Sequence, residues 1–467
     1  MTRQSRSTLC SENGCKISAM YWLYNLGLLP FYPLLFAYTL WRRFVQKKSA
    51  ASFRGQWGKV PREVREALQP RNESTPVIWL HAVSVGEVMA ARPIARALKK
   101  VLSPCRIVLS CTTDTGFETA QTAKKNGEVD ATIYFPLDLP FPVARALNAI
   151  KPDAFLAVET ELWPNFLHLA NKRGIRCLLV NGRVSDNLLK SSSRLKWLWQ
   201  WILSNLDAIL MRGEMDAQRM RQLCETTRAD AAKVLVPGDV KLDEVSSSEE
   251  QKVLRAKWRN LLKIGDEELL LVCGSTHPAR KDNQEDEEKT LVSIYAELAS
   301  NFPLRLLVAP RHVERVGQAR DWSHGIYGPA SLRSEIEDSD GTEIIVLDTV
   351  GELSEIYAAA DVAFVGGSLV SRGGHNVLEP VLRGVPVLFG PHMQNFRAAA
   401  DFVQKEKLGE QVSDESTLRE RLEYWLGNAQ ERAAIPQRAR RALQPHQGTA
   451  RRIAQEVSKQ LKSHRKN

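Results

Sequence analysis

The sequence predicts an α/β protein with two domains, each built around a parallel β-sheet. Short apolar runs of the kind that form buried parallel strands alternate with helical stretches, first between residues 77 and 236 and again between residues 269 and 389. A polar stretch, Val245–Gln251, separates the two series and is typical of an interdomain linker. The chain has 467 residues, whereas a single hydrophobic core seldom organises more than about 250–300.

The first series contains six predicted strands, and polar or small residues follow several of them. The strands are Val77–Leu80, Ile107–Ser110, Phe155–Val158, Cys177–Val180, Ala208–Met211 and Val234–Val236. The residues at their carboxyl ends include Ser84, Gly86, Glu87, Thr113, Glu159 and Glu161. Because ligands of such sheets bind beyond the carboxyl ends of the strands, we expect these residues to face a ligand.

The second series contains the most informative stretch of the chain, Gly366–Pro391. Its predicted strands are Leu269–Cys273, Arg305–Ala309, Ile344–Leu347, Asp361–Val365 and Val385–Phe389. Glycines let backbone N–H groups approach a ligand, Asn376 can cap a helix, and Glu379 in its first turn can accept hydrogen bonds from sugar hydroxyls. This pattern indicates a nucleotide-sugar pocket with a phosphate at a helix N-terminus. The alternative is an ordinary βαβ unit whose glycines serve packing alone.

Four charged residues of the first domain are candidates for catalysis. Glu87 begins a predicted helix, where it can act as a general base or simply complement the helix dipole. Glu159 and Glu161 are two residues apart, so in an extended backbone they point the same way, like the paired carboxylates of glycosidases. The alternative is that they cap the next helix. Lys241 lies at the end of this domain. The alternative interpretation is that it is a surface lysine without a role in the reaction.

Basic residues in the second domain suit recognition of an anion. Arg311 and His312 follow a strand and a proline, where they can bind phosphate or base or can be ordinary surface side chains. His277 lies in a similar loop and is expected to be structural. The run Arg280–Lys289 predicts a solvated loop and helix start. No His, Cys or carboxylate cluster has metal-ligand spacing, so neither a metal nor another cofactor is expected.

The N-terminal segment Ala19–Trp41 is uncharged over 23 residues, long enough to cross a hydrocarbon core of about 30 Å. Aromatic residues lie near its ends and Arg42 and Arg43 follow at once, which predicts that the globular body lies on the cytoplasmic side. Pro30 and Pro33 interrupt the run, so a kinked anchor that lies in one leaflet is the alternative.

The net charge of +10 indicates an anionic partner. No nucleic-acid-binding motif is present, so we expect membrane phospholipid or an anionic glycolipid rather than nucleic acid. The seven cysteines are scattered without a CxxC pair, which is typical of reduced thiols in a reducing compartment.

Eight segments form a pattern that occurs together in one family. They are HAVSVGE (81–87), TTDTG (112–116), FPLDLP (135–140), ETELWPN (159–165), GDVKLD (238–243), GSTH (274–277), APRH (309–312) and GGSLVSRGGHNVLEP (366–380). They cover roughly residues 20–400, and together they resemble the 3-deoxy-D-manno-oct-2-ulosonic acid (Kdo) transferases of bacterial lipopolysaccharide synthesis. The resemblance implies an inverting, metal-independent enzyme of the GT-B fold that moves Kdo from CMP-Kdo to a lipid A precursor, lipid IVA.

The resemblance also implies an organisation and a set of roles. It divides the chain into an extension (1–19), an inner-membrane anchor (20–48), a cytoplasmic acceptor-binding domain (49–245) and a CMP-Kdo-binding domain with terminal helices (246–467). It makes Glu87 the general base, and Glu159 and Lys241 the stabilisers of the transition state. It places CMP contacts at Pro310, Arg311, Val350, Gly351, Glu352, Asn376, Val377, Leu378 and Glu379, with Val350 where Met is commoner.

Three other functions stay open on the residues alone. A GT-B transferase or epimerase that uses UDP-sugars would have to recognise a pyrophosphate. A membrane-bound scaffold without catalysis is opposed by the joint presence of Glu87, Glu159 and Lys241. Nucleic-acid binding through net charge alone would depend strongly on salt.

Overall fold

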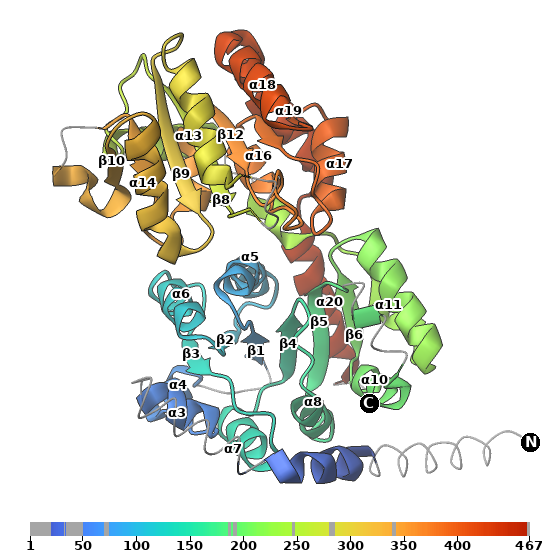
Figure 1. Cartoon of the computed structure of the whole chain (residues 1–467). Helices are drawn as coiled ribbons and strands as arrows, with labels where there is room; N and C mark the ends of the chain where they lie inside the picture. The colour runs from blue at the N-terminus through green and yellow to red at the C-terminus, as the bar shows by residue number, and fades with distance from the viewer. Residues whose placement is uncertain are drawn as a thin grey trace, which may run out of the picture. The chain divides into compact units, whose positions relative to one another are not determined.

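The computed structural model describes residues 20–31, 33, 50–69, 74–184, 188–189, 194–244, 248–279, 285–338 and 342–464. The chain forms two compact units, residues Met1–Asp243 with His446–Asn467 and residues Glu244–Pro445 (Figure 1). Each unit holds one seven-stranded sheet in which every pair of neighbouring strands is parallel. The predicted α/β architecture with two parallel sheets is confirmed.

The sheet of the first unit has the strand order β3-β2-β1-β4-β5-β6-β7. In that order the strands are Ala131–Tyr134, Arg106–Cys111, Val77–His81, Ala154–Val158, Arg176–Gly182, Ala208–Met211 and Val234–Leu235. Five of the six predicted runs lie wholly in strands, and the sixth, Val234–Val236, extends one residue beyond β7. The short edge strand β3 is missing from the prediction.

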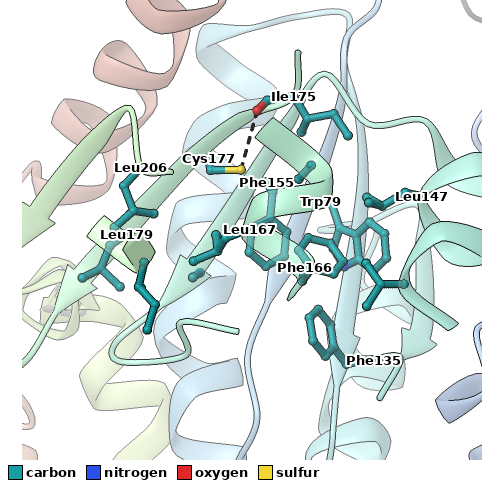
Figure 2. Close-up of a cluster of buried hydrophobic side chains, with 14 of the residues drawn as sticks. Trp79, Phe135, Leu147, Phe155, Phe166, Leu167, Ile175, Cys177, Leu179 and Leu206 are labelled. Atoms are coloured by element: carbon teal, nitrogen blue, oxygen red, sulfur yellow. Dashed lines mark hydrogen bonds between the residues drawn. The ribbon is translucent and has the colours of Figure 1, made fainter. Parts of the chain in front are cut away.

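Helices cover both faces of this sheet. They are the helix at residues 20–28, α3 (Ala50–Gln56), α4 (Arg62–Ala67), α5 (Val85–Val101), α6 (Asp114–Lys125), α7 (Pro140–Ile150), α8 (Pro164–Asn171), α10 (Lys196–Ser204), α11 (Glu214–Thr227) and α20 (Thr449–His464), with 3-10 helices at Leu29–Phe31, Ala231–Lys233 and Val240–Glu244. Alternate strand residues enter two cores, Trp79 on one face and Ile78 and Leu80 on the other. Figure 2 shows the first core, where the rings of Trp79 and Phe155 pack around Phe166 at centroid distances of 4.9 and 4.2 Å.

The last helix, α20, belongs to the first unit, although the sequence predicts one domain over 246–467. Figure 1 shows this dark red helix among the blue and green elements of the first unit. Its buried residues Ala450, Ile453, Ala454, Val457 and Leu461 join the core around α5. Asp243 accepts hydrogen bonds from the backbone N–H groups of Thr449 and Ala450 at 3.0 and 2.6 Å. The prediction is wrong for this segment, because an amphipathic pattern does not identify the sheet against which a helix packs.

The sheet of the second unit has the order β10-β11-β9-β8-β12-β13-β14. In that order the strands are Ala330–Leu332, Ile344–Val346, Leu304–Pro310, Leu269–Thr276, Val362–Val365, Val387–Phe389 and Gly409–Gln411. The helices are α12 (Ser248–Leu261), α13 (Glu287–Leu298), α14 (Val316–Ile326), α15 (Leu353–Ile356), α16 (Leu378–Leu382), α17 (Arg397–Lys405), α18 (Glu415–Gly427) and α19 (Ala429–Leu443), with 3-10 helices at Val313–Arg315, Arg333–Asp338, Tyr357–Ala359 and Gln444–His446. The strand order reverses beside β8, which places the loops after β9, β8 and β12 next to one another.

Two polar segments differ from their predictions. Of the expected linker Val245–Gln251, residues 245–247 lie outside the described residues, and α12 already begins at Ser248. Of the charged run, residues 280–284 are not described, but Glu287 and Glu288 are only 1% and 0% exposed. The prediction of a solvated run is therefore wrong at these two carboxylates.

Of the predicted membrane anchor, residues 19, 32 and 34–48 lie outside the described residues. Residues 20–28 form a helix and Leu29–Phe31 a 3-10 helix. Within the described ranges, no helix combines the length and the apolar character needed to cross a bilayer.

The helix at residues 20–28 packs on the first unit. The ring of Tyr21 stacks on His168 with centroids 4.6 Å apart. Asn25 Nδ2 donates a hydrogen bond to Asn165 Oδ1 at 2.8 Å. One face of the helix is therefore docked by polar and aromatic contacts rather than by its aliphatic side chains.

Replacing Ile453 of α20 with alanine should destabilise the first unit and leave the second unchanged. Ile453 is fully buried, and truncating such a side chain costs about 2–5 kcal/mol of unfolding free energy. Leu422→Ala is the matched control, because Leu422 is equally buried in the core of the second unit. Hydrogen–deuterium exchange, followed peptide by peptide in the full chain, separates the two effects. Loss of protection confined to the second unit in Ile453→Ala would contradict the assignment of α20.

Candidate active site

Glu87 lies in the first turn of α5, directly beyond the carboxyl end of β1. Its Oε2 accepts a hydrogen bond from the backbone N–H of Val83 at 2.7 Å, and its Oε1 accepts one from the Ser84 hydroxyl at 3.0 Å. Burial and the nearby Glu159 raise the pKa of Glu87, although the two hydrogen bonds and Lys241 act in the opposite direction. Glu87 therefore closes the start of the helix and also has the environment of a group that can exchange a proton.

Glu159 and Lys241 form an ion pair, with Lys241 Nζ 3.2 Å from Glu159 Oε1. Glu159 follows β4 and has a φ of +62°, a left-handed conformation that costs a non-glycine residue about 1–3 kcal/mol. Its N–H donates to the carbonyl of Val180 at 3.0 Å, and its own carbonyl accepts from Arg183 N–H at 3.3 Å. Backbone strain that neighbouring bonds maintain at a strand end is typical of a functional site.

Asn181 and Asp239 place Lys241, and the sequence analysis missed both. Asn181 Oδ1 accepts a hydrogen bond from the backbone N–H of Val240 at 3.1 Å, and Asp239 Oδ1 accepts one from that of Lys241 at 3.0 Å. Asn181 is fully buried and has a φ of +53°. The available signal was an asparagine at the end of an apolar strand, because asparagine tolerates this conformation better than other residues with a Cβ.

Glu161 does not align with Glu159 in the way that an extended backbone would require. The chain turns at Glu159 and Thr160, so the spacing of two residues does not place both side chains on one face. Burial, Glu87 and Glu159 nevertheless raise the pKa of Glu161 to about 7, while a hydrogen bond from Trp163 opposes the shift. Three carboxylates thus influence one another at this sheet edge.

The two glutamates also do not cap the following helix, α8. The backbone N–H groups of Asn165 and Phe166 donate instead to the carboxylate of Asp138, at 3.1 and 2.8 Å. Burial raises the pKa of Asp138 to about 6. The capping alternative for Glu159 and Glu161 is therefore wrong, because Asp138 from the FPLDLP segment performs it.

His81 fixes the orientation of the turn that carries these glutamates. Its Nε2 accepts a hydrogen bond from Trp163 Nε1 at 3.2 Å, and its Nδ1 lies 3.0 Å from Ser110 Oγ. Burial lowers the pKa of His81 to about 3, so the ring is neutral and carries its proton on Nδ1.

The residues expected to contact CMP all belong to the second unit. Pro310 ends β9 and Arg311 follows it; Val350, Gly351 and Glu352 precede α15; Asn376 and Val377 lead into α16, which begins with Leu378 and Glu379. The three groups follow the carboxyl ends of β9, β11 and β12, which belong to one sheet. Their contact with a nucleotide stays a prediction.

The helix predicted at Asn376 starts later and is shorter than expected. α16 covers only Leu378–Leu382, and Asn376 Oδ1 accepts a hydrogen bond from the Leu378 N–H at 3.2 Å. Because a helix dipole sums over aligned peptide units, five residues supply little charge for a phosphate.

The backbone amides of the first glycine turn are occupied by the protein itself. Glu287 accepts hydrogen bonds from the N–H groups of His277, Gly367, Ser368 and Leu369 at 2.9, 2.6, 3.0 and 2.9 Å. Burial raises the pKa of Glu287 to about 7 against these bonds. The prediction that this turn offers its amides to a ligand is therefore wrong. Glu287 instead ties the loop after β8 to the loop after β12.

Five of the seven cysteines lie within the described residues. Cys105, Cys111, Cys177, Cys224 and Cys273 are buried and unpaired. In the same part of the chain, no three His, Cys, Asp or Glu side chains are grouped so as to hold a metal ion.

Comparison with known proteins places the chain among transferases of one acidic sugar. A family model described as 3-deoxy-D-manno-octulosonic-acid transferase (kdotransferase) matches residues 56–244. A 3-deoxy-D-manno-octulosonic acid transferase of Bordetella pertussis is 31% identical over 92% of this chain and 97% of the relative. One from Chlamydophila psittaci is also 31% identical, over 85% of this chain and 87% of the relative. The chain spans half the length of a similar Fusobacterium nucleatum bifunctional glycosyltransferase/methyltransferase, at 32% identity over 72% of this chain.

Solved structures share the fold at low identity. UDP-GlcNAc 2-epimerase from Neisseria meningitidis aligns with a TM-score of 0.56 and 13% identity over 83% of this chain and 99% of that protein. A glycosyltransferase from Rickettsia africae aligns with a TM-score of 0.52 and 11% identity over 83% of this chain and 98% of that protein. The architecture of two parallel α/β sheets that GT-B proteins share thus extends over most of the chain.

Glu287→Ala should destabilise the second unit by about 3 kcal/mol or more. The substitution leaves several buried N–H groups without an acceptor, and each costs about 1–3 kcal/mol. Glu285→Ala is the control, because its pair with Lys289 is an exposed i,i+4 contact of small value. Denaturant unfolding of the full chain, with exchange protection read in the second unit, measures both variants. Equal stability of the two would show that Glu287 does not hold the loops.

Proposed function

Because the chain belongs to the 3-deoxy-D-manno-octulosonic acid (Kdo) transferase family, we propose that it transfers Kdo from CMP-Kdo to a hydroxyl of a lipid A precursor, lipid IVA, in lipopolysaccharide synthesis. The observation that supports this activity best is the meeting of Glu87 with the Glu159–Lys241 ion pair at one sheet edge. Each group comes from a different segment of the first unit, namely the start of α5, the turn after β4 and the 3-10 helix Val240–Glu244, so their proximity is a product of the fold.

In this proposal Glu87 is the general base. Its carboxylate takes the proton of the acceptor hydroxyl while the hydroxyl oxygen bonds to the anomeric carbon of Kdo, opposite to CMP. The bond from that carbon to the phosphate oxygen breaks, and its electron pair leaves with CMP, so the configuration inverts. The raised pKa of Glu87 suits this role, because a base is most effective when its pKa lies near the ambient pH.

Lys241 and Glu159 stabilise the transition state. The ammonium group of Lys241 supplies positive charge where negative charge develops, and Glu159 holds it by their 3.2 Å contact. The left-handed backbone of Glu159 keeps this pair in one arrangement, so little reorganisation is needed during the reaction.

The donor carries a single phosphate, and we propose that side chains rather than a divalent metal neutralise it. Arg311 follows β9 in the second unit and is exposed. A UDP-sugar donor is less well supported, because the likeness to the UDP-GlcNAc 2-epimerase is one of fold at 13% identity.

Incubation of the full chain with CMP-Kdo and lipid IVA should add Kdo to the lipid, measured by mass spectrometry, with or without EDTA.

Glu87→Gln should lower kcat by about 10²-fold or more, since it removes the base and keeps the shape. Glu118→Gln, on the exposed face of α6, is the control. As pH falls, wild-type activity should decline at a higher pH than an exposed glutamate would give, because the base must be deprotonated and its pKa is raised. Full turnover by Glu87→Gln would remove it as the base.

We further propose that the protein works at the inner membrane, with its two units on the cytoplasmic face. The helix at residues 20–28 docks one face on the rest of the first unit, and the 3-10 helix after it is exposed. The large apolar side chains exposed on them are Trp22, Leu23, Leu26, Leu29 and Phe31. An exposed apolar row beside a docked helix suits insertion into the headgroup region of a bilayer, and an anionic bilayer would also attract the chain's net charge of +10.

Replacing Trp22, Leu23 and Leu26 together with serine should weaken sedimentation of the full chain with phosphatidylethanolamine–phosphatidylglycerol vesicles. These side chains are 64–70% exposed, so the fold should persist. Val253→Ser, which is 69% exposed in the second unit, is the control. Undiminished vesicle binding by the triple variant would show that this helix is not the membrane contact.

A further inference from the structure

Three histidines meet where the strand order of the second sheet reverses. His277 follows β8, His312 follows β9 and His375 lies in the loop after β12, and these strands are neighbours. The rings of His277 and His375 are stacked, with centroids 5.0 Å apart, an interplanar angle of 3° and an Nε2–Nε2 distance of 2.8 Å. His312 meets His277 edge to face at 5.4 Å. Ligands of parallel sheets bind at this kind of position.

The backbone is shaped to admit the stacked pair. Gly367 has a φ of +64°, and a Cβ there would lie 3.0 Å from a ring carbon of His375 and 3.1 Å from one of His277. The Gly367 N–H donates to Glu287, so the glycine is held against the rings. A residue with a side chain at position 367 would therefore collide with the stacked pair.

Positive charge surrounds the two rings. Burial first, and then neighbouring histidines and arginines, lower the pKa of His277 and of His375 to about 4. The arginines are Arg311, which acts on both rings, and Arg372, which acts on His277. Both are exposed, and neither guanidinium has an ion pair or hydrogen bond within the described residues. The buried Nδ1 of His277 also lacks a partner there.

We propose, on the premise of the Kdo transfer proposed above, that His277, His375, Arg311 and Arg372 form a subsite for two adjacent anions of the donor, the phosphodiester and the sugar carboxylate. A 2-ulosonic acid joined to a phosphate through its anomeric carbon carries both groups on that one carbon. One arginine is sufficient for the single phosphate. The second arginine and the imidazole pair match the carboxylate, because guanidinium binds carboxylate and phosphate through paired hydrogen bonds.

This arrangement gives the subsite a means of selecting the donor. A nucleotide sugar without a carboxylate would leave one of the two arginines without an anionic partner. Glu287 already occupies the amides of Gly367, Ser368 and Leu369, so these three groups are not free to bind the anions. We therefore assign discrimination for acidic sugars to Arg372 and His375.

Calorimetric titration of the full chain with cytidine, CMP and CMP-Kdo, without acceptor, tests the subsite. Arg372→Ala should weaken CMP-Kdo binding by about 10- to 100-fold, the range for hydrogen bonds to charged groups, weaken CMP less, and leave cytidine unchanged. His375→Gln should also weaken binding of CMP-Kdo most and of CMP less, and leave cytidine unchanged, with smaller changes than in Arg372→Ala. Arg320→Ala, an exposed arginine of α14, is the control. Arg372 is itself exposed, so its loss should not unfold the unit.

Unchanged CMP-Kdo affinity in both Arg372→Ala and His375→Gln would overturn the subsite, while Kdo transfer by the wild-type chain could still stand. If the wild-type chain neither transfers Kdo nor binds CMP, the proposed function is wrong. The anion subsite can then be tested separately, by titrating the chain with inorganic phosphate and following the NMR signals of the histidine rings. Ring signals that respond to phosphate in the wild type and not in Arg372→Ala would support it. Ring signals that do not respond to phosphate in the wild type would overturn it.

Discussion

Backbone N–H groups at the ends of buried parallel strands need acceptors, and carboxylates supply them throughout this protein. Asp130, Asp153, Asp207 and Asp361 each directly precede a strand. Each accepts a hydrogen bond, between 2.7 and 2.9 Å long, from an N–H at the start of the neighbouring strand. Because parallel strands begin side by side, this repeated contact helps to set the register of both sheets, on which every loop at their carboxyl ends depends.

The same chemistry orders the loops at the carboxyl ends, where the candidate site residues lie. Asp138 holds the start of α8, Glu87 holds the turn before α5, and Glu287 holds two loops of the second unit together. These carboxylates occupy amides that a ligand would otherwise use. In the second unit our proposal therefore assigns the recognition of anions to arginine and histidine side chains. In the first unit Glu87 combines a structural contact with the environment of a base.

The local sequence pattern identified the strands of the buried middle of each sheet and the polar residues that follow them. Glu87 and Glu159 could be grouped in advance, because parallel topology brings the carboxyl ends of strands to one edge. Lys241 was joined to them only by the resemblance to a family. The missing strands β3, β10 and β14 all lie at sheet edges. An edge strand is short and needs fewer apolar residues, so its signal is weak. Glu161 and Asn376 were misjudged because a turn, not an extended chain or a long helix, follows the strand.

Composition, periodicity and the spacing of polar residues determined that this chain builds two parallel α/β sheets and carries the motifs of one transferase family. The tertiary structure alone decided that α20 joins the first unit, that Glu287 is buried among amides, and that His277 stacks on His375. The physical reason is common to all three. The sequence of an amphipathic or charged segment shows which of its side chains need burial or a hydrogen-bond partner. The residues that supply the burial or the hydrogen bonds lie far away in the sequence, and the packing of the whole unit determines which they are.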